Sequence, residues 1–237
     1  MADKVDILSF GAHPDDCEIG SGAFLLKMKK LGYRTGMIPL TEGDMGKGTP
    51  EIRRQETLQA AKILKVDVVE IHNFGDCRLD DNHETRVMVA GLIRKYQPEI
   101  ILAPYYGIEP GRGLGHSDHI VCGNLVTHAA NFAHLEKFPA EGKPHNIKGI
   151  LYYFLNLYQK PSILVPVDEE IPEAVKALQQ HTSQFGPLFN HGKVPSFLET
   201  SARVHGAMIG AKYAVPFILK DPIPMEDPMQ YFKKSKK

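Results

Sequence analysis

Residues 5–20 read VDILSFGAHPDDCEIG and join a short apolar run to a cluster of polar side chains. The run at 5–12 is typical of a buried strand. His13, Asp15 and Asp16 follow directly where that strand is expected to end. Two neighbouring carboxylates repel each other and are costly to bury unless a cation, a shared proton or open water neutralises them. The stretch therefore predicts a strand that leads into a polar site.

The rest of the first half alternates between strand-like and helix-like segments. Strands are expected at 5–12, 34–41, 67–74 and 98–105, and helices at 21–33, 49–66, 84–97 and 120–134. The second of these helices has a plausible N-cap, Thr49, followed by Pro50. Further strands are expected at 149–155 and 162–167, and further helices at 172–185 and 198–213. This order predicts a Rossmann-like three-layer α/β sandwich with a mostly parallel central sheet.

The composition favours one compact domain and excludes several functional classes. With 237 residues, no internal repeat and no linker, we expect a single domain over 1–237, ending in a basic, solvated tail at 233–237. The formal net charge is zero and no basic face is evident, so a nucleic-acid partner is not expected. There is no signal peptide pattern and no run of about 18 apolar residues, so no membrane partner is expected.

The cysteines point to a reducing compartment. Cys17, Cys77 and Cys122 are an odd number without CxxC spacing, which favours free thiols in the cytoplasm over a disulfide framework. We interpret Cys17 as packed rather than nucleophilic. We interpret Cys77 as packed too, with a small thiol that narrows the pocket as the alternative.

Four polar clusters follow the first four predicted strands. They are AHPDD at 12–16, TEGDMGKG at 41–48, FGDCRLDDN at 74–82 and GHSDH at 115–119. Open parallel sheets bind ligands beyond the carboxyl ends of their strands. We therefore expect one site at this edge of the sheet.

The residue types in these clusters suit a divalent metal. The candidates are His13, Asp15, Asp16, His116, Asp118 and His119. Imidazole and carboxylate ligands are typical of zinc, with iron, cobalt or manganese as alternatives. A catalytic zinc site uses three protein ligands, which leaves an acidic group free to act as general base. The alternative is structural: the Asp pair could be a helix N-cap with a solvated neighbour, and the two later histidines could lie on an exposed turn.

Two of these segments resemble a known family. GAHPDDCEIGSGA and GHSDH are similar to the two motifs of the LmbE-like (PIG-L) zinc-dependent N-deacetylases, the second of which is usually written HPDH. TEGDMGKGTPEIRRQE, FGDCRLDDN, HTSQF and GAKYAVPF extend the resemblance over nearly the whole chain. The branch that it most resembles is the bacillithiol-biosynthesis (BshB-type) deacetylases, which remove acetyl from an N-acetylglucosamine conjugate.

The resemblance implies a role for each residue of the cluster. The ligands of one Zn²⁺ per chain would be His13, Asp16 and His119. Asp15 would be the general base that activates water. His116 would stabilise the oxyanion or protonate the leaving amine, and Asp118 would orient His116 and raise its pKa.

The resemblance also suggests which residues contact the substrate. Arg53 matches a family arginine that binds substrate oxygens, and Asp76 matches an acid that holds sugar hydroxyls. Arg112, in an unusual GIEPGRGLG segment, and His181 are further candidates for the pocket. Cys77 stands where the family pattern commonly has Gly.

The expected function is a zinc-dependent hydrolase that removes acetyl from an N-acetylglucosamine-type sugar or conjugate, N-acetylglucosaminyl malate among them. Two alternatives stay open: an amidase or other metal enzyme acting on another N-acyl or S-conjugate substrate, and a non-catalytic Rossmann-like protein that binds a metal or nucleotide. The expected partner is a small N-acetylated sugar. The resemblance also implies a homo-oligomer, either a trimer or a hexamer.

Overall fold

A seven-stranded sheet forms the middle layer of the protein. The computed structural model describes residues 4–186, 193–227 and 229. Among these residues the strand order is β3-β2-β1-β4-β5-β7-β6. The strands are β1 (Ile7–Gly11), β2 (Thr35–Pro39), β3 (Val68–Val69), β4 (Ile100–Pro104), β5 (Gly149–Tyr153), β6 (Ile163–Pro166) and β7 (Ala214–Leu219).

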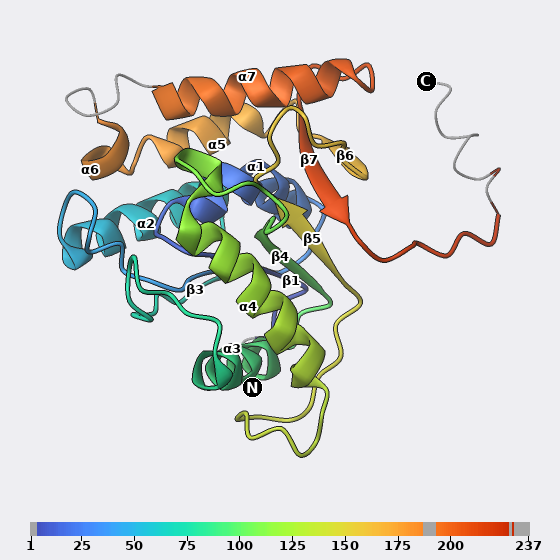
Figure 1. Cartoon of the computed structure of the whole chain (residues 1–237). Helices are drawn as coiled ribbons and strands as arrows, with labels where there is room; N and C mark the ends of the chain where they lie inside the picture. The colour runs from blue at the N-terminus through green and yellow to red at the C-terminus, as the bar shows by residue number, and fades with distance from the viewer. Residues whose placement is uncertain (1–3, 187–192, 228, 230–237) are drawn as a thin grey trace.

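Helices cover both faces of this sheet (Figure 1). They are α1 (Asp16–Lys30), α2 (Pro50–Leu64), α3 (His83–Tyr96), α4 (Ser117–Ala133), α5 (Ile171–Leu178), α6 (Thr182–Phe185) and α7 (Lys193–Ala207), with a short 3-10 helix η1 (Gly113–Gly115). Apolar residues of α1, α2, α5 and α7 share one core cluster, and those of α3 and α4 share the other. The expected three-layer α/β sandwich is confirmed.

The central strands supply both cores because successive side chains point to opposite faces. In β1, Ile7 packs into the cluster on the α1 side, while Leu8 and Phe10 pack into the cluster on the α3 side. All of β1 is buried. This explains why its sequence is a continuous apolar run rather than an alternating one.

The sheet changes direction of growth between β1 and β4. β1 pairs in parallel with β2 on one side and with β4 on the other. The chain therefore winds outward in both directions from this point, and the loops after β1 and β4 diverge to leave a crevice. His13 lies in the first of these loops and His116 in the second.

The far edge of the sheet is antiparallel. β7 runs antiparallel to both β5 and β6. No strand was expected at 214–219, where Pro216 lies within an apolar run. Pro216 is accommodated here beside Leu164 of β6.

Several element boundaries differ from the expected ones. α1 begins at Asp16 rather than at residue 21, and α4 begins at Ser117 rather than at residue 120. The single helix expected at 172–185 is broken into α5 and α6. The predicted N-cap Thr49 is confirmed, because its side chain accepts a hydrogen bond from the Ile52 N–H.

The expectations about a membrane span, the basic tail and a single domain are tested only in part. None of the described helices is both long and apolar enough to cross a membrane. The basic tail at 233–237 lies outside the described residues, and the single-domain assignment over 1–237 stays a prediction.

Candidate active site

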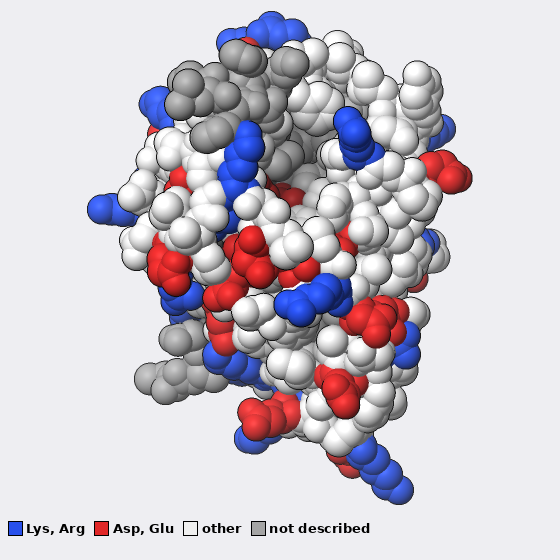
Figure 2. All heavy atoms as spheres, turned by 60° about the vertical axis from the view of Figure 1, so that its left-hand side comes forward, with Lys and Arg blue, Asp and Glu red and all other residues white. Residues whose placement is uncertain are grey.

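A cavity of about 850 Å³ opens at the carboxyl edge of the parallel strands. Figure 2 shows a hollow in the surface, with acidic side chains in its depth. Loops after β1, β2, β3 and β4 all contribute to the lining, as the sequence analysis expected. The predicted site residues on its wall are His13, Asp15, Asp16, Arg53, Asp76, Arg112, His116 and His119.

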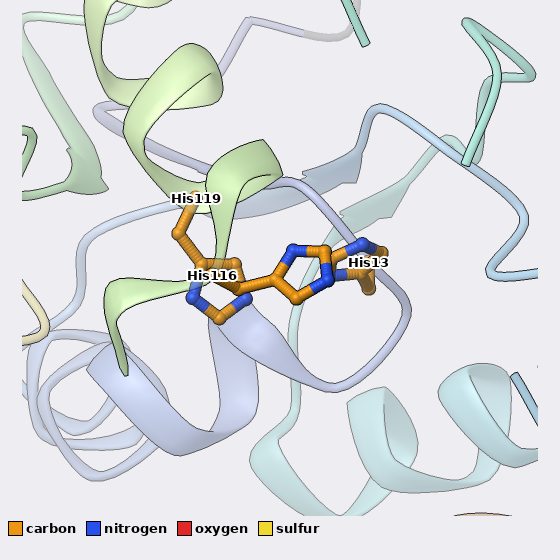
Figure 3. Close-up of side chains that lie close together, drawn as sticks. All are labelled: His13, His116 and His119. Atoms are coloured by element: carbon orange, nitrogen blue, oxygen red, sulfur yellow. The ribbon is translucent and has the colours of Figure 1, made fainter. Parts of the chain in front are cut away.

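Three histidines face one another in this cavity (Figure 3). The ring centroids of His13 and His116 are 5.0 Å apart, those of His13 and His119 are 5.3 Å apart, and those of His116 and His119 are 5.4 Å apart. One ring nitrogen from each lies within 4.8 Å of the other two. The loop after β1 and the start of α4 thus converge on a space of the size that one metal ion needs.

Asp16 lies between two of these histidines. Its Oδ1 is 3.1 Å from Nε2 of His119, and its Oδ2 is 3.5 Å from Nδ1 of His13. Burial by itself would raise the pKa of Asp16, but the charges and hydrogen bonds of His119 and His13 hold it well below its usual value. Asp16 is therefore an ionised carboxylate between two imidazoles, a donor set that suits zinc.

His13 is held from its other side by two more carboxylates. Its Nε2 lies 3.2 Å from Oδ1 of Asp76 and 3.3 Å from Oδ2 of Asp118. Burial would lower the pKa of His13, yet Asp118, Asp16 and Asp76 together raise it to about 12. This excess of negative charge must be neutralised by a proton on His13 or by a cation. A ligand imidazole commonly donates its second N–H to a carboxylate, and here Nε2 is placed to do so while Nδ1 faces Asp16.

The expected partnership of Asp118 with His116 is found only in part. The Asp118 carboxylate contacts His13 and accepts a hydrogen bond from the Cys77 N–H at 2.7 Å. Burial and the charges of His13 and His119 lower the pKa of His116 overall, and they outweigh the charge of Asp118, which acts to raise it as expected. The helix start explains this placement. Because α4 begins at Ser117, His116 is its N-cap, and Asp118 lies in the first turn with its carboxylate against His13.

The helix start also fixes the ring of His116. The Asp118 backbone N–H donates to Nδ1 of His116 at 3.2 Å. Because Nδ1 accepts this bond, the proton of the neutral ring is on Nε2. His116 can therefore donate a hydrogen bond from Nε2.

Asp15 is buried like Asp16 but differs from it in backbone conformation, in contacts and in the direction of its pKa shift. It precedes α1 with φ 131°, a left-handed conformation that non-glycine residues rarely adopt, and its side chain makes no cap hydrogen bond. The structural alternative, a simple N-cap, is therefore wrong. Burial raises the pKa of Asp15 to about 6 even though Arg53 lowers it. A buried carboxylate with a pKa near neutrality suits a general base.

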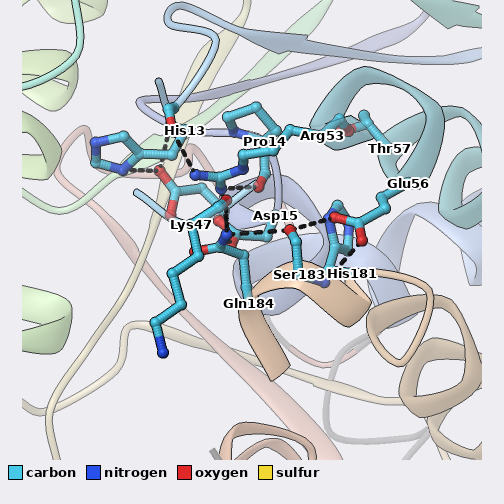
Figure 4. A network of polar contacts seen from close by, with 12 residues as sticks. His13, Pro14, Asp15, Lys47, Arg53, Glu56, Thr57, His181, Ser183 and Gln184 are labelled. Carbon is cyan, nitrogen blue, oxygen red and sulfur yellow. Dashed lines mark hydrogen bonds and ion pairs between the residues drawn. The ribbon is translucent and has the colours of Figure 1, made fainter. Parts of the chain in front are cut away.

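Arg53 connects the loops that carry these groups (Figure 4). It is buried, and its guanidinium donates to the carbonyl oxygens of Gly43 at 2.9 Å and Pro14 at 2.7 Å, and to Oδ2 of Asp15 at 3.3 Å. Gly43 has a φ of 65°, and a Cβ there would lie 2.2 Å from the guanidinium. Three donor contacts are thus made inside the protein, which indicates that Arg53 holds Asp15 in place.

The other candidates for substrate contact differ in position. Asp76 is buried on the cavity wall and accepts a hydrogen bond from the Met45 N–H at 2.9 Å. Arg112 is exposed and lines the cavity just before η1. The expectation for His181 is wrong, because this residue is fully buried, is not among the described residues that line the cavity, and pairs with Glu18 at 3.1 Å.

The packed interpretation of Cys77 is also wrong. Cys77 is exposed and lines the cavity, and its φ is 58°. A left-handed backbone explains why the family pattern commonly has Gly at this position. Cys17, in contrast, is buried as expected, and burial raises its pKa well above the usual value.

An apolar part of the lining was not expected from the sequence. Phe154 follows β5 directly and packs its ring 4.8 Å from the ring of His119. The rule that polar or unusual residues at strand ends form the site could have found it, since β5 is the next parallel strand after β4. Other apolar lining residues are Ile19, Ile108, Leu114, Phe185, Val194 and Phe197.

Comparisons with known proteins find relatives that match most of the chain. The chain is 31% identical over 226 residues to the diacetylchitobiose deacetylase of Thermococcus kodakarensis, covering 90% of this chain and 82% of the relative. A solved structure of a conserved protein from Thermus thermophilus has 33% identity and a TM-score of 0.85, covering 94% of this chain and 98% of that one.

A bacillithiol-type relative matches less well. The probable N-acetyl-alpha-D-glucosaminyl L-malate deacetylase 2 of Bacillus anthracis is 25% identical over 205 residues, covering 78% of this chain and 84% of the relative. The expected special likeness to that branch is therefore only weakly supported. The family model for GlcNAc-PI de-N-acetylases (PIG-L) matches residues 8–130, which contain every residue of the histidine and carboxylate cluster. The chain belongs to the PIG-L family of de-N-acetylases.

Proposed function

We propose that this protein is a zinc-dependent hydrolase that removes an acetyl group from the nitrogen of an N-acetylglucosamine-type sugar or a conjugate of one. The observation that carries the proposal is the contrast between the adjacent carboxylates. Asp16 lies between His13 and His119, whereas Asp15 stays outside that triangle with a pKa of about 6. A buried carboxylate beside a metal site, with a pKa close to neutrality, is typical of catalytic sites.

The donor chemistry supports one metal ion on His13, Asp16 and His119. The set contains two imidazoles and one carboxylate, typical of catalytic zinc, and other divalent transition metals could replace it. When bound, such an ion polarises the amide carbonyl and favours ionisation of water. Asp76 and Asp118 hold the ring of His13 and so orient it as a ligand.

The surrounding residues are placed for the proton transfers of amide hydrolysis. Water adds to the carbonyl carbon while Asp15 accepts its proton. His116, which has its Nε2–H free to donate, stabilises the negative charge that develops on the carbonyl oxygen. The C–N bond breaks as the amine nitrogen takes up the proton that Asp15 accepted. The products are acetate and the free amine.

The substrate assignment rests on the relatives and on the polar wall. The relatives described above are a diacetylchitobiose deacetylase and a glucosaminyl malate deacetylase, both named for N-acetylglucosamine compounds. Asp76 offers a buried carboxylate for sugar hydroxyls, and Arg112 offers an exposed cation at the rim. The most specific substrate that we propose is N-acetylglucosaminyl malate. A trimeric or hexameric assembly and a cytoplasmic location stay predictions.

The test pairs metal analysis with release of free amine. We would incubate the protein with N-acetylglucosamine, diacetylchitobiose and N-acetylglucosaminyl malate and detect amine with fluorescamine. About one zinc per chain, with amine release that a chelator abolishes and zinc restores, is expected. A protein that takes up zinc but releases amine from none of the three would contradict the substrate class. Failure to take up any divalent metal would contradict the mechanism itself.

A further inference from the structure

The cavity has two walls of opposite chemistry. One wall comes from the loops after β2 and β3 and carries the Asp76 carboxylate and the backbone of Met45 that donates to it. The other wall comes from α1, η1, the end of β5 and α7. Its apolar side chains are Ile19, Leu114, Phe154 and Phe197, and the polar side chains Arg112, just before η1, and Asn156, after β5, line the cavity as well.

The reacting centre lies between these walls. His13 contacts the polar wall, since its Nε2 is 3.2 Å from Asp76. His119 contacts the apolar wall: its ring centroid is 4.8 Å from that of Phe154, and its Nδ1 is 3.2 Å from the Leu114 carbonyl oxygen. A group bound between the two histidines therefore has carboxylate on one side and hydrocarbon on the other.

The apolar wall is continuous and well supported. Its four apolar side chains also line a small cavity of about 40 Å³ behind the main one, so they lie next to one another. Ile19 and Leu114 pack against the core cluster of the α1 face. Phe154 is 6% exposed and Phe197 is 46% exposed, so the wall runs from a buried inner end to an open rim.

The two walls can hold the acyl chain and the amine part of an amide apart. The carbonyl carbon carries the acyl chain on one side and the amine nitrogen on the other. If the sugar hydroxyls bind at Asp76, the acyl chain is directed along Phe154 toward Phe197. An acetyl methyl group would cover only the inner end of this wall, and among the described residues nothing else covers the outer end at Phe197, which is 46% exposed.

Resting on the proposed function, we infer that the apolar wall is a subsite for an acyl chain longer than acetyl. The substrate class it favours is glucosamine whose nitrogen carries an apolar acyl chain. The test measures kcat/KM for glucosamine release from its N-acetyl, N-butanoyl, N-hexanoyl and N-octanoyl derivatives. We expect kcat/KM to rise about fourfold for each methylene group that the wall buries. A steady fall from acetyl onward would overturn the inference and leave the proposed deacetylase function intact.

Binding gives a readout that does not depend on turnover. Calorimetric titration of the Asp15→Asn variant with N-octanoylglucosamine and N-acetylglucosamine compares the two ligands directly. Tighter binding of the octanoyl compound is expected, and equal or weaker binding would overturn the subsite. Absence of turnover with every chain length, together with tighter octanoyl binding, would contradict the proposed reaction and not the subsite.

A pair of variants on one helix locates the effect. Phe197→Ala removes the outer part of the wall and should lower the octanoyl-to-acetyl ratio of kcat/KM roughly tenfold. Val204→Ala is the matched control, because Val204 lies on the same helix, is 44% exposed, and does not line the cavity. Its ratio should equal that of the unmodified protein. An unchanged ratio in the Phe197→Ala variant, with its melting temperature retained, would overturn the assignment.

Discussion

Two regions of the chain contribute differently to the same cavity. Residues 5–133 form strands β1 to β4 with α1 to α4 and supply every histidine and carboxylate at the reacting centre. Residues 149–219 contain β5 and the antiparallel edge and supply the aromatic side chains Phe154, Phe185 and Phe197. The first region supplies the reacting groups and part of the apolar lining, Ile19 and Leu114, whereas the second supplies the aromatic side chains around them.

The difference follows from where each region can place a charge. Asp16 and Asp118 lie in the first turns of α1 and α4, where free backbone N–H groups and the helix dipole favour a carboxylate. The ends of parallel strands bring those two turns together at the crevice. Within the described residues, the second region lacks such a carboxylate over the cavity, and its lining there is uncharged: the amides Asn156 and Gln184 beside apolar side chains.

The largest expected effect comes from breaking the chemistry of the first region alone. Asp15→Asn removes the proposed base while keeping a side chain that tolerates positive φ. We expect kcat to fall about 100- to 10,000-fold. Zinc content, measured by elemental analysis, should not change, because Asp15 lies outside the ligand triangle. Asp44→Asn, an exposed change in the next loop, is the control. Activity within tenfold of the unmodified protein would contradict general-base catalysis by Asp15.

A second substitution tests the corrected partner of Asp118. Asp118→Asn weakens the carboxylate support of His13, and such changes typically cost about 10- to 100-fold in metal affinity. Competition with a chelator of known affinity measures this directly. Asp80→Asn, exposed in the loop after β3, should leave the affinity unchanged. If Asp118 served His116 instead, as the resemblance implied, activity would fall with metal affinity retained, and that result would contradict the support of His13 by Asp118.

The two regions also differ in how far the sequence predicted them. In the first region the strand ends are local signals, so the convergence of His13, Asp76 and His116 could be expected from the alternation of strands and helices. The start of α1 at Asp16 could not be expected in this way. Asp16 and Glu18 are buried there, and burial of a charge is understandable only once the partners His119 and His181 are known.

In the second region the deciding contacts are far apart in the sequence. The break between α5 and α6 places the fully buried His181 against Glu18, an ion-pair partner 163 positions away. Helical periodicity over 172–185 contains no trace of this contact, so a single helix was expected. The apolar wall was missed for a related reason: Phe154 and Phe197 resemble ordinary core residues until the cavity is seen.

The smallest expected effect concerns the junction between the two regions. Glu56 of α2 is buried and accepts hydrogen bonds from Thr182 Oγ1 at 2.9 Å, Ser183 N–H at 2.7 Å and Ser183 Oγ at 2.6 Å. It thereby fixes α6, whose Gln184 and Phe185 line the cavity. Figure 4 shows this contact beside Asp15 and Arg53.

Glu56→Gln replaces one of these acceptor oxygens by a donor. We expect a loss of roughly 1–3 kcal/mol in the free energy of unfolding, since one buried donor is left unsatisfied. For a chain of this size each kcal/mol lowers Tm by about 2–4 °C, which a thermal melt resolves. Glu51→Gln, on the exposed first turn of the same helix, is the matched control. Because α6 shapes the cavity but holds no reacting group, KM should rise while kcat stays nearly constant. A fall in kcat at unchanged KM would mean that the second region acts on the chemistry, and the division drawn between the two regions would fail.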